Sequence, residues 1–229
     1  MNRVAITGQG VISSIGKSVK EVYESLVGGL SGITSLEIED VERLKVQSAG
    51  QIKDYDPLQF FEAHEIVKMD KFSQFAIIAA RQAVNDSGLS FKNENLAVSS
   101  GVILGSSAGG MSTLNESYKL VFEKEKNKVH PYTIPKIMAN SAASNISIAF
   151  NIQGPSFTVS SACSSSNHAM GLAYETIKSG RQKVVLTGGS ESLLSFGEKR
   201  FIPIIFNLIF CLFKSSILSV KKFSNNLKR

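Results

Sequence analysis

The sequence is poor in the residue types that define several common classes of protein. Only two cysteines, Cys163 and Cys211, occur in 229 residues, so a disulfide framework is excluded and a reducing compartment, the cytoplasm, is expected. The three histidines, His64, His130 and His168, have no spacing typical of metal ligands, so we expect no metal site. No long apolar run with a cleavage site follows the first residues, which argues against a signal peptide.

The positive net charge comes from the carboxy-terminal tail. Residues 199–229 contain seven basic and no acidic residues, and removing these seven charges from the net charge of +6 leaves −1 for residues 1–198. The body of the chain has no basic stripe, so we expect no nucleic-acid partner.

Apolar periodicity and turn residues predict that helices and strands alternate along most of the chain. Asp70 is expected to cap a helix that Ser87-Gly88 would end. Alternation of this kind predicts an α/β domain with a mixed or largely parallel sheet. The expected helices span residues 19–27, 71–85, 110–125, 140–150 and 169–178, and the expected strands span residues 4–7, 46–52, 96–104 and 183–187.

Cys163 lies in the most informative segment of the chain. Residues 154–160 predict a turn followed by a short β-rich run, and residues 169–178, rich in small and apolar side chains, predict a helix. The thiol is therefore expected where a strand turns into a helix, close to free N–H groups and the positive dipole end, a placement that favours a nucleophilic thiolate. The alternative is that Cys163 is a small buried hydrophobic residue. Spacing alone leaves both interpretations open.

Four segments together carry a family resemblance. They are residues 3–13, the sequence Gly105-Ser106-Ser107-Ala108-Gly109-Gly110, the proline-containing residues 131–147, and the Cys163 segment with the strand that ends in Leu186-Thr187-Gly188-Gly189-Ser190-Glu191. In type and order they resemble the β-ketoacyl-acyl-carrier-protein synthases, the elongating condensing enzymes of the thiolase fold. The resemblance covers about residues 1–198.

The resemblance implies a thiolase-like α/β fold, layered αβαβα, of which this chain holds the amino-terminal half. It implies decarboxylative Claisen condensation of an acyl thioester with malonyl-carrier, in fatty-acid or polyketide synthesis. Cys163 would be the nucleophile, with its own backbone N–H as one oxyanion donor, and Ala108 would line the acyl channel. The implied partners are acyl carrier protein, acyl and malonyl thioesters and, in the intact enzyme, a second copy in a homodimer. No metal or redox cofactor is implied.

The family's cysteine works with two histidines and a lysine of the carboxy-terminal half, and no segment here resembles theirs. His168 lies five residues beyond Cys163. In one continuous helix it would point about 140° away around the axis, so we interpret it as structural. The chain is therefore expected to be a truncated enzyme that is inactive alone, with an amino-terminal synthase domain in residues 1–198.

Residues 199–229 form a tail of different composition, apolar in residues 201–213 and then basic. The apolar run is shorter than the ~20 residues that span a bilayer. We expect that the tail is non-native and arose from a frameshift near Arg200, and an interfacial membrane anchor is the alternative.

Three other functions remain as alternatives. Residues 4–10 suggest a dinucleotide-binding turn, but Ser13 occupies the third glycine position. Residues 105–109 match a serine-hydrolase elbow, with His130 downstream of several glutamates crowded into one helix and its loop. The third alternative is a non-catalytic remnant or interaction module. A polyketide chain-length partner is disfavoured, because such a partner lacks the nucleophile and this chain has Cys163.

Overall fold

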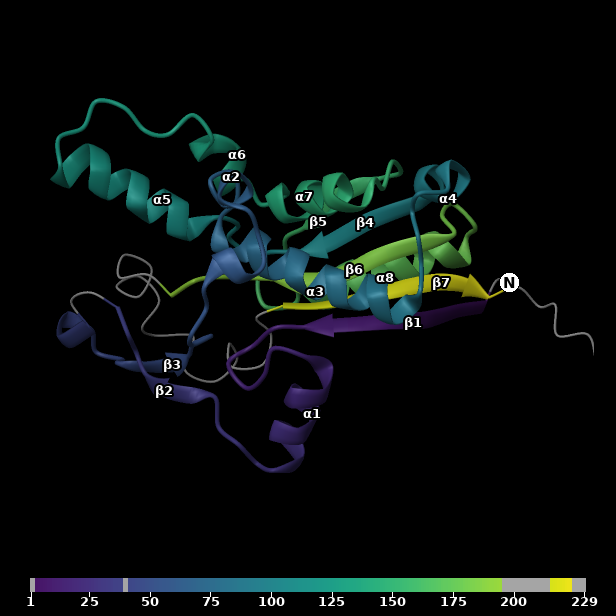
Figure 1. The fold of residues 1–229 in the computed structure, drawn as a ribbon, viewed down its shortest axis with the longest axis horizontal. Helices are drawn as coiled ribbons and strands as arrows, with labels where there is room; N and C mark the ends of the chain where they lie inside the picture. Colours follow the sequence, from purple (N-terminus) through teal and green to yellow (C-terminus); the bar gives the residue numbers. More distant parts are fainter. Residues whose placement is uncertain (1–2, 39–40, 195–214, 224–229) are drawn as a thin grey trace, which may run out of the picture.

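The computed structural model describes residues 3–38, 41–194 and 215–223, the last of these by their backbone alone. Its centre is a five-stranded sheet, with β4 parallel to β5 and β6, and with β7 antiparallel to β1 and β6 (Figure 1). The order across the sheet is β1 (Arg3–Val11), β7 (Ser215–Phe223), β6 (Val184–Ser190), β4 (Ser100–Gly105) and β5 (Ser156–Val159). The predicted mixed α/β sheet is confirmed.

Helices cover both faces of this sheet. On one face α3 (Lys71–Ser87) and α7 (Ser141–Phe150) enclose a core that includes Val102, Leu104 and Leu186. On the other face α8 (Ser165–Lys178) packs its Ala169, Ala173 and Ile177 against Ile103 and Val185. Successive side chains of β4 and β6 thus alternate between two apolar layers, as the period of a strand requires.

Helix α3 forms as the sequence predicts. Asp70 is the N-cap, and its Oδ1 accepts a hydrogen bond of 3.2 Å from the N–H of Phe72. Gly88 ends the helix in the left-handed conformation, with φ of 63°, where glycine is favoured. Residues 72–80 are buried throughout, so α3 is a core helix.

Two glycines of β1 explain how closely α3 approaches the sheet. A Cβ added at Gly8 would lie 2.8 Å from the amide nitrogen of Ser87, and one at Gly10 would lie 2.8 Å from the Cβ of Gln82. The pattern that suggested a dinucleotide-binding turn therefore serves helix–strand packing.

Shorter elements surround this core. Strands β2 and β3 pair antiparallel in a separate small sheet, and α1 and α5 lie at the periphery (Figure 1). These elements are α1 (Val19–Val27), β2 (Ile33–Ser35), η1 (Val41–Arg43), β3 (Ser48–Gly50), η2 (Pro57–Gln59), α2 (Ala63–Ile66), α4 (Glu94–Val98), α5 (Met111–Tyr118), the π-helical η3 (Lys119–Glu123) and α6 (Thr133–Ile137).

Several predicted elements differ from the structure. Only Ser48–Gly50 of the strand expected over residues 46–52 is a strand, and α8 begins at Ser165, before the expected residue 169. The strand expected over residues 96–104 is wrong in its first part, because Asn93 caps the short helix α4 and β4 begins only at Ser100. Asn93 Oδ1 accepts a hydrogen bond of 3.1 Å from the N–H of Leu96, and this local cap outweighs the β-like pattern. The single helix expected over residues 110–125 is divided into α5 and the π-helical turn η3.

One segment of the tail, residues 215–223, belongs to the described structure. The backbone of residues 215–223 forms β7, and in the described sheet β1 is joined to β6 through this strand. The apolar residues 201–213 lie outside the described residues, so the frameshift and the membrane anchor stay hypotheses. Of the helices in the described ranges, none is long and apolar enough to cross a membrane.

Candidate active site

Three segments meet where the parallel strands β4, β5 and β6 end. Gly105 at the end of β4 is in register with Val159 of β5 on one side and with Gly189 of β6 on the other. The segments that follow are residues 106–110, called here the glycine-rich loop, residues 160–164, called the cysteine turn, and Glu191. Because the carboxyl ends of parallel strands lie at one edge of a sheet, these segments share that edge.

The cysteine turn connects β5 directly to α8. Ala162 has a φ of 51°, a left-handed conformation that costs a residue with a Cβ free energy and that is often found at functional sites. The serine hydroxyls close the turn: Ser164 Oγ donates to the carbonyl of Ser161 at 2.7 Å, and Ser165 Oγ donates to that of Ala162 at 2.6 Å. Cys163 is free and exposed at this turn.

Exposure of Cys163 disagrees with the interpretation that it is a small buried hydrophobic residue. Its place between β5 and α8 agrees with the expected strand-to-helix turn. The nucleophilic role itself stays a prediction.

The helical geometry assumed for His168 is wrong, because α8 begins at Ser165 with Ser164 as N-cap, so Cys163 precedes the helix. His168 instead reaches back to the cysteine turn, where its Nδ1 lies 2.7 Å from Ser161 Oγ. This contact ties the first turn of α8 to the residues before Cys163.

Two glycines seat α8 on the ends of the strands. A Cβ at Gly105 would lie 2.5 Å from the carbonyl oxygen of Ser165, and one at Gly189 would lie 2.8 Å from the Cβ of Ser166. No real Cβ makes contacts this short, so both positions require glycine for the helix to lie where it does. The position of Cys163 thus depends on the ends of β4 and β6.

The glycine-rich loop is organised by a carboxylate that sequence analysis left without a role. Oε1 of Glu191 accepts hydrogen bonds from Ser106 Oγ at 3.2 Å, from Ser107 Oγ at 2.9 Å and from the backbone N–H of Ser107. The backbone of Ala108 also bonds to this carboxyl group. Burial raises the pKa of Glu191 above its ordinary value, and the hydrogen bonds from the loop oppose that rise only in part.

Ala108 lies in this loop and is partly buried. The loop is linked to the cysteine turn through Ser160, whose Oγ lies 3.5 Å from the carbonyl oxygen of Ser107. Ala108 and Cys163 therefore lie in two neighbouring segments of one sheet edge.

The other candidate residues serve local structure. His130 Nδ1 accepts a hydrogen bond of 3.2 Å from the N–H of Tyr132, and His64 lies in the short helix α2. The Ser107 hydroxyl donates to Glu191, so the serine-hydrolase pattern does not become a triad through His130. Within residues 3–38, 41–194 and 215–223, no group of three or more His, Cys, Asp or Glu side chains could hold a metal ion.

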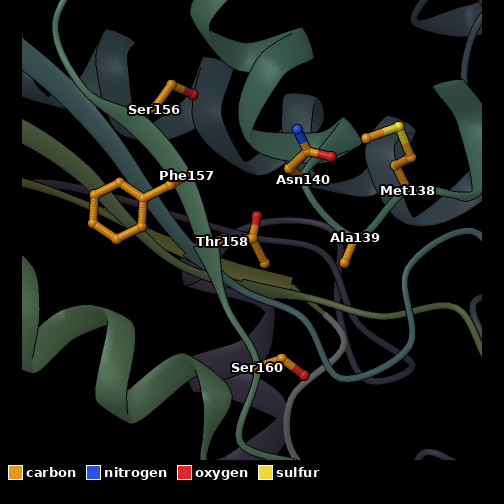
Figure 2. Close-up of a pocket in the computed structure, with 7 residues that line it drawn as sticks. All are labelled: Met138, Ala139, Asn140, Ser156, Phe157, Thr158 and Ser160. Carbon is orange, nitrogen blue, oxygen red and sulfur yellow. The ribbon is translucent and has the colours of Figure 1, made fainter.

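A cavity of about 440 Å³ lies beside β5 (Figure 2). Figure 2 shows Thr158 on the side of the strand that faces residues 138–140, with the ring of Phe157 on the other side. The residues that line the cavity are Met138, Ala139, Asn140, Ser156, Phe157, Thr158 and Ser160. The cavity thus reaches the first residue of the cysteine turn.

Comparison with solved structures defines the class of fold. The chain superposes on the ishigamide ketosynthase/chain length factor with a TM-score of 0.85 at 24% identity, covering 97% of this chain and 59% of that one. A β-ketoacyl synthase from Burkholderia phymatum STM815 gives a TM-score of 0.79 at 22% identity, covering 97% and 60%. A type II polyketide acyl-carrier protein in complex with its ketosynthase bound to the hexaketide gives 0.79 at 20% identity, covering 97% and 63%. The fold is the thiolase-like fold of the ketosynthases.

Sequence comparison defines the family. The family model "Beta-ketoacyl synthase, N-terminal domain" matches residues 1–200. The chain is 35% identical over 190 residues to 3-oxoacyl-[acyl-carrier-protein] synthase 2 of Staphylococcus aureus (strain COL), covering 83% of this chain and 46% of the relative. The enzyme of the same description from Vibrio harveyi is 35% identical over 189 residues, covering 82% and 45%.

The chain therefore belongs to the β-ketoacyl synthase family, whose members are transferases of fatty-acid and polyketide synthesis, and the predicted family is confirmed. It spans about half the length of the curated relatives it matches.

Proposed function

We propose that this chain is the acyl-accepting part of a condensing enzyme of fatty-acid or polyketide synthesis, with Cys163 as the nucleophile. The observation that carries the proposal is the exposed thiol at a strained turn between β5 and α8, in a chain that matches the synthase family over residues 1–200.

The proposed first step is transfer of an acyl group from its carrier to Cys163. The thiolate attacks the thioester carbonyl, a new carbon–sulfur bond to Cys163 forms as the carbon–sulfur bond to the carrier breaks, and the carrier leaves as its thiolate, which takes up a proton from water. The backbone N–H of Cys163 supplies one donor to the oxyanion that develops on the carbonyl oxygen. Ala108, in the adjacent loop, is proposed to lie against the acyl chain.

We also propose that the chain alone does not complete the condensation. Decarboxylation of a malonyl thioester requires polar donors that face the malonyl group. His168 is engaged with Ser161, and His130 bonds to the backbone of its own loop. Losing general acid–base assistance alone commonly costs about 10²–10⁴-fold in rate.

The proposed partners are an acyl carrier protein, acyl and malonyl thioesters, and a second copy of the chain in the intact enzyme. A similar solved structure contains a ketosynthase with its carrier protein, which supports the first. Strand β5 lies at one edge of the described sheet, with Phe157 exposed there, which supports pairing with a second copy. The proposed location is the cytoplasm, and neither a metal nor a redox cofactor takes part.

A non-catalytic remnant or interaction module is the second candidate. It is favoured by the exposed apolar side chains of α1 and the segment after it, where Tyr23 is 67%, Val27 71% and Leu30 64% exposed.

The test is an assay of carbon–carbon bond formation with acyl-carrier and malonyl-carrier, using the purified chain. We expect no condensation product. Turnover that Cys163→Ala abolishes, but Cys211→Ala does not, would overturn the proposal of a partial enzyme, because the catalytic groups would then lie within these residues.

A further inference from the structure

Glu191 follows β6 and reaches across to the segment that follows β4. Its partners Ser106 and Ser107 are 85 and 84 residues away in the sequence, and the parallel register of β4 with β6 brings them together. Glu191 thus joins two of the three segments at the sheet edge.

We propose that Glu191 is a positioning residue of the acyl-accepting site: it fixes the glycine-rich loop that carries Ala108 and, through Ser107, the cysteine turn. This inference rests on the proposed function and deepens it, because it names a residue that sets the shape of the acyl path without touching the acyl group.

The loop is shaped to hold a carboxylate. The N–H groups of Ser107 and Ala108 are consecutive, and two serine hydroxyls add further donors to the same carboxyl group. Successive backbone N–H groups that converge in this way bind anions, and hydrogen bonds to a charged acceptor are stronger than those between neutral groups. The loop also bonds internally, since Gly109 N–H donates to Ser106 Oγ at 3.1 Å.

Ser107 transmits this restraint to the cysteine turn. Its N–H and its hydroxyl both donate to Glu191, while its carbonyl oxygen lies 3.5 Å from Ser160 Oγ. Ser160 is the first residue of the cysteine turn, so the path from Glu191 to the residues around Cys163 passes through Ser107 and its backbone carbonyl to the side chain of Ser160.

The two carboxylate oxygens of Glu191 differ in a way that suggests a sharp test. Oε1 accepts the hydrogen bonds from Ser106 Oγ, Ser107 Oγ and the N–H of Ser107, whereas Oε2 is buried without a hydrogen-bond partner among the described residues. In Glu191→Gln the amide oxygen can take the place of Oε1 as the acceptor, but the bonds lose the negative charge and the NH2 group takes the place of the unpartnered Oε2. Glu191→Ala removes them all. Glu175→Gln, an exposed position on α8, is the matched control.

The first measurement is hydrogen exchange of the Ser107 and Ala108 amides in the full-length chain. We expect exchange at least about tenfold faster in Glu191→Ala, a smaller increase in Glu191→Gln, and no change in Glu175→Gln. Ser107→Ala removes only the hydroxyl bond, so a smaller increase, about threefold, is expected there. This variant keeps the inference testable if Glu191→Ala does not fold.

The second measurement is the labelling of Cys163 by N-octylmaleimide and N-methylmaleimide, followed on the Cys163 peptide. We expect the ratio of the octyl to the methyl rate to fall roughly tenfold in Glu191→Ala and to be kept in Glu191→Gln.

Unchanged amide exchange in a folded Glu191→Ala chain, or in Ser107→Ala where the former does not fold, overturns the proposal. Faster exchange with an unchanged rate ratio also overturns it, because the loop would then be held without shaping the path to Cys163. If the exchange and the rate ratio both respond as expected while wild type accepts no acyl group from a carrier thioester, the positioning role stands and the proposed function fails.

Discussion

Replacing Gly105 by alanine is the perturbation that most directly tests how α8 is seated. The added methyl group would lie 2.5 Å from the carbonyl oxygen of Ser165 and would overlap the backbone at Ser166. Because this obstacle is backbone at the start of a helix, it cannot move aside as the end of a flexible side chain could. Overpacking of this kind typically costs about 1–3 kcal/mol, and we expect the upper end of that range.

Gly171→Ala is the matched control on the same helix. Gly171 lies in the middle of α8 on its solvent-exposed side, and an added Cβ would have no atom within 4 Å. Alanine is favoured over glycine by about 0.5–1 kcal/mol inside a helix, so this variant should be more stable than wild type. Both substitutions add one methyl group. Gly105→Ala is expected to lower the free energy of unfolding and Gly171→Ala to raise it, so the two variants should differ by about 4 kcal/mol.

The assay is urea unfolding followed by circular dichroism, combined with the rate at which iodoacetamide labels Cys163. We expect Gly105→Ala to lower the free energy of unfolding and to change the labelling rate, because the start of α8 must shift. A Gly105→Ala chain as stable as Gly171→Ala, with a wild-type labelling rate, would refute the argument that the glycine seats the helix.

Three further outcomes are expected. In a full-length enzyme that contains this domain, Ala108→Phe should shift preference toward short acyl chains, and an unchanged chain-length profile would remove Ala108 from the acyl path. Asp70→Ala should lower the free energy of unfolding by about 3 kcal/mol, because its Oδ1 caps α3 and its Oδ2 accepts from Thr113 N at 2.7 Å and Thr113 Oγ1 at 2.6 Å; a urea midpoint equal to wild type would contradict this. Burial raises the pKa of Glu191 above 4.5, so the folded chain holds this proton more tightly than the unfolded chain does. The resulting contribution to the free energy of unfolding is fully present below pH 4.5 and is lost as the pH rises through the folded-state pKa. Glu191→Gln does not titrate, so its free energy of unfolding relative to wild type should increase from about pH 4.5 upward. If urea unfolding gives the same pH dependence for both chains, the raised pKa is contradicted.

The elements that sequence predicts well are those with local signals. Asp70 as N-cap and Gly88 as C-cap define α3, and the structure confirms both. The β-rich run before Cys163 and the small residues after it predict the strand-to-helix turn that the structure has there. Where two local signals compete, as at Asn93, the cap decides the structure, and the strand begins later than the β-like pattern predicts.

The contacts that sequence could not predict are between residues far apart in the chain. The role of Glu191 depends on the register of β4 with β6, which no local pattern specifies. An acidic residue directly after a buried strand in a parallel sheet is the one signal that could have directed attention to it. Gly8 and Gly10 suggested a ligand site, whereas their reason is the approach of α3, which appears only when the fold is assembled.

The central claim is that Cys163 accepts the acyl group, and mapping the acyl adduct tests it most directly. The purified chain is incubated with an acyl-carrier thioester, digested, and examined by peptide mass spectrometry, with Cys163→Ala and Cys211→Ala beside wild type. We expect the acyl mass on the Cys163 peptide of wild type and of Cys211→Ala, and none in Cys163→Ala. An acyl group on Cys211 instead, or a folded chain whose Cys163 is alkylated by iodoacetamide but never acylated by the thioester, would contradict the account.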